Sequence, residues 1–289
     1  MIAEYLKLFR VNQWIKNSFV FVPLVFSQNL FNKTLFFPTL YGFIIFCLTS
    51  SVVYIINDII DAGEDRQHPV KKNRPVASGK ISVRSALISA LFPSAFVIIT
   101  VFSYPLLFGL SVLTFFLLNV LYSFFLKKIV ILDVFSIAAG FALRVLAGAF
   151  VIDVTISSWL ILTTMFISLF LGVMKRHSEI SLTTRDVSGA TRKVLSQYSL
   201  TFTDQMATVA SAGVIICYAL YTVSERTVEV FHTENLIYTT PFVVFGIFRY
   251  MYLVYMNDEG ENTSKILFTD LPMILTVLLY LIVTILIIY

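Results

Sequence analysis

Four acids and five bases lie together in one stretch, residues 57–80, which reads NDIIDAGEDRQHPVKKNRPVASGK and is flanked by apolar sequence. Asp58, Asp61 and Asp65 would lie within about 60° of one another around a helix that continues through them. Carboxylates this close repel one another unless a cation lies among them. Hard oxygen ligands favour magnesium, which completes its shell with phosphate oxygens and water. The stretch therefore predicts a magnesium–diphosphate site that includes Asn57. The alternative is a solvated helix end whose acids pair with nearby Arg and Lys.

Basic residues follow the acids directly, and three of them are candidate phosphate ligands: Arg66, Lys71 and Arg74. An Arg offers phosphate a planar pair of donors, whereas a Lys offers a point charge. Arg74 is favoured because Pro75 restricts the backbone just before it. His68 is interpreted as a loop residue rather than a metal ligand. The alternative for each base is topology alone, because cytoplasmic loops of membrane proteins are basic in any case.

Four further candidates lie near or within apolar runs: Lys16, Tyr122, Lys127 and Arg144. Arg144 is the only Lys or Arg deep in such a run, and intramembrane charges are functional candidates by default. It shares a helix face with Asp133, about 16 Å away along the axis. The alternatives are an interfacial Tyr with a snorkelling Lys and a structural role for Arg144 inside a helix bundle.

A second charged stretch, KRHSEI at 175–180, begins the other long polar connection of the chain. Its candidate residues are Lys175, Arg176 and Glu179, and Arg192 follows in the same connection. Their position in the second long connection, which like 57–80 follows a predicted span, favours a functional role. The alternative is an ordinary helix ion pair between Lys175 and Glu179, which are four residues apart.

These residues must be positioned by membrane-spanning helices. Of the 289 residues, 58% are hydrophobic and 13% are charged, whereas a soluble domain carries about a quarter charged residues. Apolar runs of roughly 20 residues, the length that crosses a hydrocarbon core, recur throughout. The sequence predicts an all-α polytopic membrane protein with nine transmembrane helices in one domain, 1–289. The predicted spans are 18–31, 36–56, 83–103, 106–126, 129–152, 157–174, 203–223, 236–256 and 266–289.

The Lys and Arg residues also predict an orientation. They cluster in alternate connections, while the opposite connections hold only Lys33 and Arg226. Because basic loops stay in the cytoplasm, we expect a cell (inner) membrane protein with its N-terminus and its charged cap loops in the cytoplasm and its C-terminus outside. This pattern argues against nucleic-acid binding, and the N-terminal region lacks the pattern of a removable signal peptide. Cys47 and Cys217 fit buried hydrophobic positions. A homo-oligomer is compatible with the sequence.

The motif NDxxDxxxD, placed after a second span in a chain with nine spans, resembles the UbiA-type intramembrane prenyltransferase superfamily. The resemblance covers essentially the whole chain. It implies a UbiA-like helix bundle in which Asp58, Asp61 and Asp65 coordinate Mg2+ on a diphosphate. Members normally carry a second acidic motif, DxxxD, after the sixth span, where this chain has KRHSEI. Together with RVNQWIKN, YSFFLKKIVILDV and GFALRVLAGA, that loop resembles one branch, the decaprenyl-phosphate phosphoribosyltransferases.

The branch implies transfer of the 5-phosphoribosyl group from 5-phosphoribosyl 1-diphosphate to a polyprenyl (decaprenyl-type) phosphate, with release of diphosphate. Bases in place of a second acidic motif suit a site that must also hold a 5-phosphate and an acceptor phosphate. The candidates for the 5-phosphate are Lys175, Arg176 and Arg192, and those for the acceptor phosphate are Lys16, Lys127 and Arg144.

Two other functions compete with this interpretation. The nearer is a prenyltransferase that moves a polyprenyl group from its diphosphate to an aromatic or other small acceptor. The other is a transporter or lipid-binding protein that uses the acids as a cation site. Transport is disfavoured because most ionisable residues lie at one face and Arg144 alone lies deep in a span.

Overall fold

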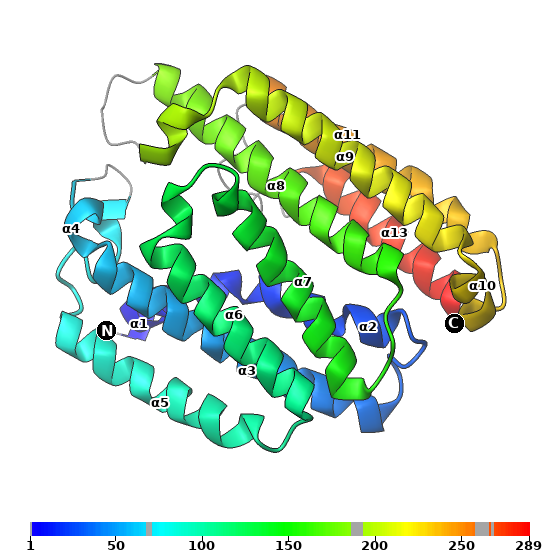
Figure 1. The fold of residues 1–289 in the computed structure, drawn as a ribbon, viewed down its shortest axis with the longest axis horizontal. Helices are drawn as coiled ribbons and strands as arrows, with labels where there is room; N and C mark the ends of the chain where they lie inside the picture. The colour runs from blue at the N-terminus through cyan, green and yellow to red at the C-terminus, as the bar shows by residue number, and fades with distance from the viewer. Residues whose placement is uncertain (1, 68–70, 186–192, 258–265, 267–268) are drawn as a thin grey trace. The chain divides into compact units, whose positions relative to one another are not determined.

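The structure, a computed structural model, describes residues 2–67, 71–185, 193–257, 266 and 269–289 (Figure 1). In these residues every regular element is a helix, which confirms the predicted all-α architecture. The chain forms two compact units. The first unit comprises Met1–Lys127 and Leu143–Thr155, and the second comprises Lys128–Ala142 and Ile156–Tyr289. Arg192 and His68, both considered above, lie outside the described residues.

The helices of the first unit are α1 (Ile2–Leu8), η1 (Val11–Phe21), α2 (Val22–Val25), α3 (Lys33–Ile60), α4 (Ala62–Asp65), η2 (Lys71–Asn73), α5 (Val83–Val101) and α6 (Leu106–Phe124), followed by η3 (Leu126–Lys128). Helix α7 (Leu132–Ile152) contributes to both units. The second unit contains α8 (Ser158–Arg185), η4 (Lys193–Gln197), α9 (Leu200–Val223), α10 (Glu225–Phe231), η5 (Asn235–Thr239), α11 (Thr240–Asn257) and α13 (Leu271–Ile288).

Among the described residues, eight helical segments are long and apolar enough to cross a membrane. They correspond to the second to ninth predicted spans, and the chain is a multi-pass membrane protein. The helices that begin the two charged stretches are longer than predicted, because α3 extends to Ile60 and α8 to Arg185. Both charged stretches therefore begin as continuations of membrane-spanning helices.

The first predicted span, 18–31, is not one long helix, so the count of nine is not confirmed. Its residues belong to the 3-10 helix η1 and the short helix α2. Helix η1 runs antiparallel to α3, since Trp14 Nε1 donates to Ser51 Oγ at 3.0 Å and the Phe21 ring lies 5.5 Å from the Phe43 ring. A 3-10 helix rises about 2.0 Å per residue. The 11 residues of η1 therefore extend about 22 Å along α3. An α-helix would need more residues to cover the same distance.

The core of the first unit packs η1, α3, α6 and α7 together. Phe46 lies at its centre, with its ring centroid 5.2 Å from that of Phe115 and 6.1 Å from that of Phe108. Helix α7 approaches η1 so closely that a Cβ built at Gly148 would lie 2.1 Å from the Val20 carbonyl oxygen. Only glycine fits at this contact.

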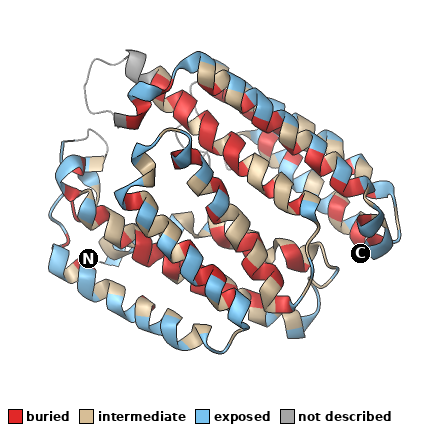
Figure 2. Ribbon diagram, viewed as in Figure 1, coloured by how far each residue is buried: buried red, intermediate tan, exposed pale blue. Residues whose placement is uncertain are grey.

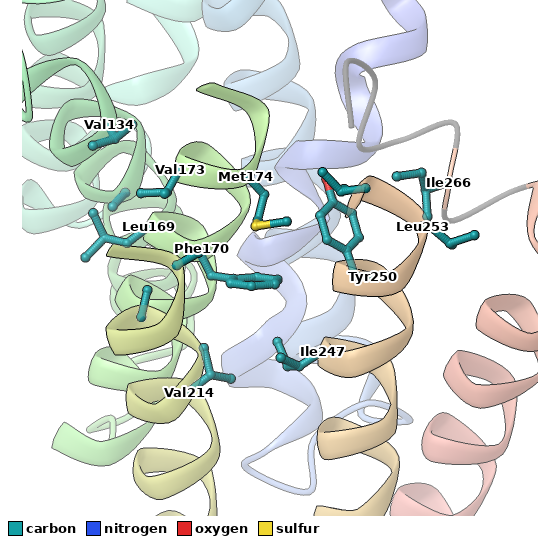
Figure 3. Packing of buried hydrophobic residues seen from close by; sticks show 14 of the residues in the cluster. Val134, Leu169, Phe170, Val173, Met174, Val214, Ile247, Tyr250, Leu253 and Ile266 are labelled. Atoms are coloured by element: carbon teal, nitrogen blue, oxygen red, sulfur yellow. The ribbon is translucent and has the colours of Figure 1, made fainter. Parts of the chain in front are cut away.

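The core of the second unit is built mainly by α8, α9 and α11. Phe170 and Met174 of α8 point toward Tyr250 of α11, and Val214 of α9 lies below them (Figure 3). The rings of Phe170 and Tyr250 meet edge to face with centroids 5.6 Å apart, an orientation that aromatic pairs favour.

Helix α5 is the least buried of the apolar helices. Only 17% of its most apolar window is buried (Figure 2). Its exposed side chains include Leu91, Phe92 and Ile99. In a bilayer such a face contacts lipid tails, so the exposure of these side chains carries no functional signal of its own.

Candidate functional site

The three aspartates of the 57–80 stretch lie at the end of α3 and in α4, as their spacing predicts. Helical hydrogen bonding continues through them, because Asp61 N donates to Asn57 O at 2.9 Å and Asp65 N donates to Asp61 O at 2.8 Å. Asp58 and Asp65 are deeply buried, with 1% and 3% of their surfaces exposed. Asp61, which caps the end of α3, is half-buried. The helix-end alternative expected solvated acids paired with Arg and Lys, and the structure shows the pairing but buries two of the three acids.

Arg74 joins the two buried carboxylates. Its Nη1 lies 2.7 Å from Asp65 Oδ2 and 3.3 Å from Asp58 Oδ1. Arg10, whose guanidinium lies 4.6 Å from the centroid of the Tyr54 ring, forms a second ion pair with Asp58 Oδ1. Asp58 therefore faces two guanidinium groups, and each carboxylate retains a cationic partner where burial would otherwise penalise its charge.

Lys127 neutralises the third carboxylate. Its Nζ lies 2.6 Å from Asp61 Oδ1, although 66 residues separate the two in sequence. The three aspartates of the stripe therefore face three bases, namely Arg10 before η1, Arg74 in the loop after α4, and Lys127 in η3.

The loop that carries Arg74 is held by its own contacts. Arg66 Nε donates to Ala77 O at 3.2 Å, so this predicted phosphate ligand stabilises the loop backbone. Val76 and Ile81 are buried in a small apolar cluster with residues of α1 and α3. The turn that closes the loop uses Gly79 at a φ of +75°, which favours glycine. The guanidinium of Arg74 is therefore presented by a segment whose described residues are held by these contacts.

The donor chemistry of the stripe fits a magnesium ion, although no three His, Cys, Asp or Glu side chains among the described residues form a group that could hold a metal. Two carboxylates converge on one cationic atom, Arg74 Nη1. Magnesium commonly takes one or two carboxylates and completes its shell with water and substrate phosphates. Asp58 and Asp65 are therefore the pair best placed to hold the ion, with Asp61 beside them.

Arg144 lies inside the first unit and not at the aspartate stripe. It is 6% exposed. Its Nε donates to Asn17 Oδ1 at 2.7 Å, and its guanidinium lies 4.5 Å from the centroid of the Phe115 ring. Asn17 in turn donates to Cys47 Sγ at 3.3 Å. Asp133, expected about 16 Å away along the same helix, belongs to the second unit and pairs with Arg176 there.

The remaining first-unit candidates are less buried than the two acids that share Arg74. Lys16, Asn57, Lys71 and Tyr122 are each half-buried. The carbonyl oxygen of Asn57 accepts the hydrogen bond that begins the turn into Asp61. These four remain predictions as ligand contacts.

In the second unit, Asp133 is the centre of a buried network. It is fully buried, accepts from Arg176 Nε at 2.7 Å, and accepts from the Tyr198 hydroxyl at 2.6 Å. The same hydroxyl accepts from Ile131 N at 2.8 Å. Burial, followed by the hydrogen bond to Asp133, raises the pKa of Tyr198 above its ordinary value. Tyr198 thus remains a neutral donor at physiological pH.

Arg176 is held by acids of its own unit. It is 1% exposed, and its guanidinium forms ion pairs with both Asp133 and Glu179. A guanidinium so enclosed reaches a ligand only if it moves, whereas Lys175 is half-buried. The arrangement favours Arg176 as a residue that orients Glu179 and the end of α8.

A neighbouring polar cluster in the second unit ties three helices together. His177 Nδ1 lies 3.0 Å from Asp204 Oδ1 and 3.1 Å from Thr203 Oγ1. The Tyr255 hydroxyl donates to the same Asp204 oxygen at 2.9 Å. Through these contacts α8, α9 and α11 are joined at one end.

Sequence reasoning missed Arg10, Asn17 and Asp204 as members of polar networks. Arg10 and Asn17 lie in the motif RVNQWIKN, but Arg10 was counted only as a cytoplasmic charge. Their partners are 48 and 127 residues away in sequence, so no local spacing could have predicted the pairs. The only signal was the polar character of residues 10–17 beside an apolar run.

Comparisons with known proteins agree with this architecture. The sequence matches the UbiA prenyltransferase family over residues 18–287. A decaprenyl-phosphate phosphoribosyltransferase from Corynebacterium glutamicum is 31% identical over 75% of this chain and 66% of its own length. One from Mycolicibacterium smegmatis is 30% identical over 78% of this chain and 71% of its own length. An uncharacterised protein, y4nM of Sinorhizobium fredii, is 30% identical over 83% of this chain.

The chain spans about half the length of the Sinorhizobium relative, 47%, and about two thirds of the Corynebacterium relative. Among solved structures, a UbiA homolog from Archaeoglobus fulgidus bound to GPP and Mg2+ has a TM-score of 0.72 with 18% identity, covering 99% of both chains. At that identity the likeness concerns the fold. With a family match that covers nearly the whole sequence, the chain belongs to the UbiA prenyltransferase family.

Proposed function

We propose that this protein is a magnesium-dependent polyprenyl-phosphate phosphoribosyltransferase. It would transfer the 5-phosphoribosyl group from 5-phosphoribosyl 1-diphosphate to a decaprenyl-type phosphate and release diphosphate. The observation that carries the proposal is the buried carboxylate pair, Asp58 and Asp65, converging on Arg74 with Arg10 and Lys127 beside them. In such a site the acids would face the positively charged metal, and the bases would face the negatively charged phosphate groups. The names of the Corynebacterium and Mycolicibacterium relatives support phosphoribosyl as the transferred group.

Asp58, Asp61 and Asp65 would hold the magnesium, which neutralises the leaving diphosphate when bound. Arg10, Arg74 and Lys127 donate to diphosphate oxygens that the metal leaves uncovered. Arg66 and Lys71, on the same loop as Arg74, complete the basic rim. Lys127 was expected at the acceptor phosphate, but its ion pair with Asp61 favours a place beside the donor.

The remaining candidates divide between the two other phosphate groups. Lys175 and Arg192 are proposed for the 5-phosphate, with Arg176 and Glu179 orienting the end of α8. Lys16, Tyr122 and Arg144 are proposed for the acceptor phosphate, with Asn57 beside the aspartates. The lipid tail lies along apolar helices, and the two units act as one transferase domain.

The reaction needs positioning more than acid–base chemistry. Departure of diphosphate leaves positive charge on C1 of the ribose, as in other glycosyl transfers. The acceptor phosphate is already anionic, so no side chain must remove a proton from it. The side chains therefore contribute by orienting donor and acceptor and by neutralising the leaving group.

We also propose a cell (inner) membrane location with the N-terminus and the aspartate stripe in the cytoplasm and the C-terminus outside. The bias of Lys and Arg toward alternate connections supports this orientation. The course of η1 along α3 supports an additional crossing besides the eight long helices.

The second candidate is prenyl transfer from a prenyl diphosphate to a small aromatic acceptor. It is supported by the family match and by the fold shared with a homolog that binds GPP and Mg2+. It is less favoured because KRHSEI stands where a second acidic motif is expected.

A transfer assay tests the proposal. Purified protein receives ribose-labelled phosphoribosyl diphosphate, polyprenyl phosphate and magnesium, and label is counted in the lipid fraction. We expect magnesium-dependent labelling that falls by about 100-fold or more in Asp61→Asn, the scale on which loss of one preorganised charge lowers activity. Glu64→Gln, an exposed acid in the same stretch, is the matched control and should retain activity. Prenylation of an aromatic acid without lipid labelling would favour the second candidate.

A further inference from the structure

Every carboxylate of the stripe already has a cationic partner within the chain. Arg74 Nη1 lies between Asp58 and Asp65, at 3.3 and 2.7 Å from their oxygens, and Arg10 also pairs with Asp58. Both acids are almost completely buried. Their charges are therefore neutralised internally, in surroundings where an uncompensated charge is costly.

This arrangement places a metal ion and Arg74 in competition. A divalent cation held between Asp58 Oδ1 and Asp65 Oδ2 would compete with Arg74 Nη1, because that atom contacts both of these oxygens. Displacing the guanidinium without giving it another anion leaves a half-buried positive charge unpaired. Metal binding by itself is therefore weakened by the cost of that charge.

Diphosphate that binds without a metal leaves the acids, rather than the arginines, without partners. If it takes Arg74 and Arg10 without a metal, it leaves Asp58 and Asp65 with neither of their bases, and it brings further negative charge close to them. When metal and diphosphate bind together, each carboxylate exchanges an Arg for the metal and each Arg exchanges a carboxylate for a phosphate oxygen. No buried charge is then left unpaired.

We infer that Arg74, assisted by Arg10, makes the binding of the divalent cation and the diphosphate mutually dependent by exchanging partners between them. The coupling is reciprocal, so each ligand raises the affinity for the other by the same factor. The inference rests on the proposed diphosphate site but not on the identity of the group transferred. In the cell it would keep the acids paired with protein bases until the metal–diphosphate donor arrives.

Arg10 is suited to the secondary role. Its backbone is left-handed, with φ of +49°, at the junction between α1 and η1. Its guanidinium lies over the Tyr54 ring and pairs with Asp58. It thus neutralises one carboxylate, whereas Arg74 contacts both. Removing Arg10 should therefore have the same effects as removing Arg74, but smaller ones.

Metal binding alone is the first arm of the test. Full-length protein in nanodiscs is titrated with Mn2+, and free Mn2+ is measured by electron paramagnetic resonance without any phosphate compound. We expect Arg74→Gln to bind Mn2+ at least about tenfold more tightly than the wild type, since the competing guanidinium is gone. Arg84→Gln removes an exposed Arg at the start of α5 and should leave Mn2+ affinity unchanged.

Retention of labelled inorganic diphosphate is the second arm. The wild type should retain diphosphate only with Mg2+ present, and Arg74→Gln should retain it at least about tenfold less well at saturating Mg2+. The same substitution thus strengthens one affinity and weakens the other, which misfolding cannot do. If Arg74→Gln does not fold, Arg10→Gln decides the question with smaller shifts of the same signs.

The inference is overturned if the wild type binds Mn2+ as tightly without diphosphate as with it, or if neither substitution raises Mn2+ affinity. Neither arm uses a ribosyl or prenyl group. Failure of the transfer assay with the expected Mn2+ and diphosphate results would therefore reject the proposed substrate and leave this coupling intact.

Discussion

A buried cation needs partners that solvent would otherwise supply, and Arg144 obtains one from a residue 127 positions earlier in the sequence. Its Nε–H is directed at Asn17 Oδ1 at 2.7 Å, and Asn17 is itself 1% exposed. Ser50 Oγ donates to the same oxygen at 3.3 Å. One amide side chain of η1 therefore joins α7 to α3 through polar contacts inside an apolar core.

Asn17→Leu should destabilise the protein while keeping the number and branching of the side-chain heavy atoms. The substitution removes the acceptor of Arg144 Nε–H, and a buried donor that loses its partner costs about 1–3 kcal/mol of unfolding free energy. Denaturant or thermal unfolding in detergent measures the change. Asn12→Leu makes the same chemical change at an exposed position of η1, where about 0.5 kcal/mol or less is expected. Equal effects of the two substitutions would contradict the importance of this contact.

At the scale of single residues, the grouping of the three acids could be predicted from the sequence, whereas the bases that pair with them could not. The spacing of Asp58, Asp61 and Asp65 requires only the helical period, and α3 and α4 follow that period through Asp65. Pairing is different, because Lys127 and Arg10 reach the stripe from distant segments. Arg74 could be favoured because it lies close by and precedes a proline, but nothing local indicated that it would contact two carboxylates.

At the scale of helices, the close approach of α7 to η1 depends on the absence of a side chain at Gly148. A Cβ there would meet the Val20 carbonyl oxygen at 2.1 Å and Pro23 Cδ at 3.2 Å. The first contact is with backbone, so it cannot be relieved by a change of rotamer. The 3-10 path of η1 and the glycine of α7 are therefore matched features.

Gly148→Ala should lower the unfolding free energy by about 3 kcal/mol or more, at the upper end of what overpacking costs. Gly246→Ala is the matched control, because a Cβ in α11 would meet nothing within 4 Å. Alanine favours helix over glycine, so the control should gain up to about 1 kcal/mol. Melting temperatures of the two variants in one detergent give the comparison, and a stable Gly148→Ala protein would contradict the observed packing.

The start of α13 predicts a dependence of stability on pH. Asp270 accepts from Met273 N and receives two bonds from Arg249, at 3.1 and 2.7 Å. The hydrogen bond from Arg249, the largest cause, holds the pKa of Asp270 below its ordinary value of 3.8. A lowered pKa in the folded state stabilises the protein above the unfolded pKa, and this stabilisation is lost as pH falls through the folded value.

Asp270→Asn should therefore lower the melting temperature at pH 7 by an amount equivalent to about 1 kcal/mol. Asn can still cap the helix, so the change isolates the charge. As the pH falls below the ordinary value of 3.8 and through the lowered folded-state pKa, the carboxyl of the wild type becomes protonated, and the two proteins should approach each other in stability. A difference that is equally large at neutral and at this acidic pH would show that the ion pair with Arg249 is not its cause.

The helices themselves were largely predictable, because apolar runs of this length have few alternatives to a membrane-spanning helix. The predicted span that differs from the structure is the first one, 18–31. Asn12, Gln13 and Lys16 interrupt its apolar character, and their presence moved the predicted span toward residue 31. The structure instead begins this segment at Val11 as a 3-10 helix, whose polar side chains find partners on α3 and α7.

At the scale of the whole molecule, each of the two units contains its own charged network beside an apolar core. The first holds the aspartate stripe with its three bases, and the second holds Asp133 with Arg176 and Tyr198. Helix α7 contributes Asp133 to one unit and Arg144 to the other. Sequence reasoning treated these two residues as one face of one helix, which was geometrically correct but did not predict that each would bond within a different unit.

The proposed substrate rests on the charged residues of the two units and on the family to which the chain belongs. The aspartate stripe with Arg74 accounts for a metal diphosphate, whatever group the diphosphate carries. Lys175 and Arg192, in the stretch where an acidic motif is expected, are the bases proposed for an additional phosphate on the donor. The proposal of phosphoribosyl transfer depends on this second feature together with the relatives of that name.

A donor-competition experiment directly tests the proposal that the protein transfers phosphoribosyl rather than prenyl groups. One reaction contains the purified protein, magnesium, polyprenyl phosphate, an aromatic acid, ribose-labelled phosphoribosyl diphosphate and a prenyl diphosphate with a different label. Ribose label is expected to enter the lipid fraction while the prenyl diphosphate remains intact. Prenyl label appearing in an aromatic product, with the ribosyl donor unconsumed, would contradict it.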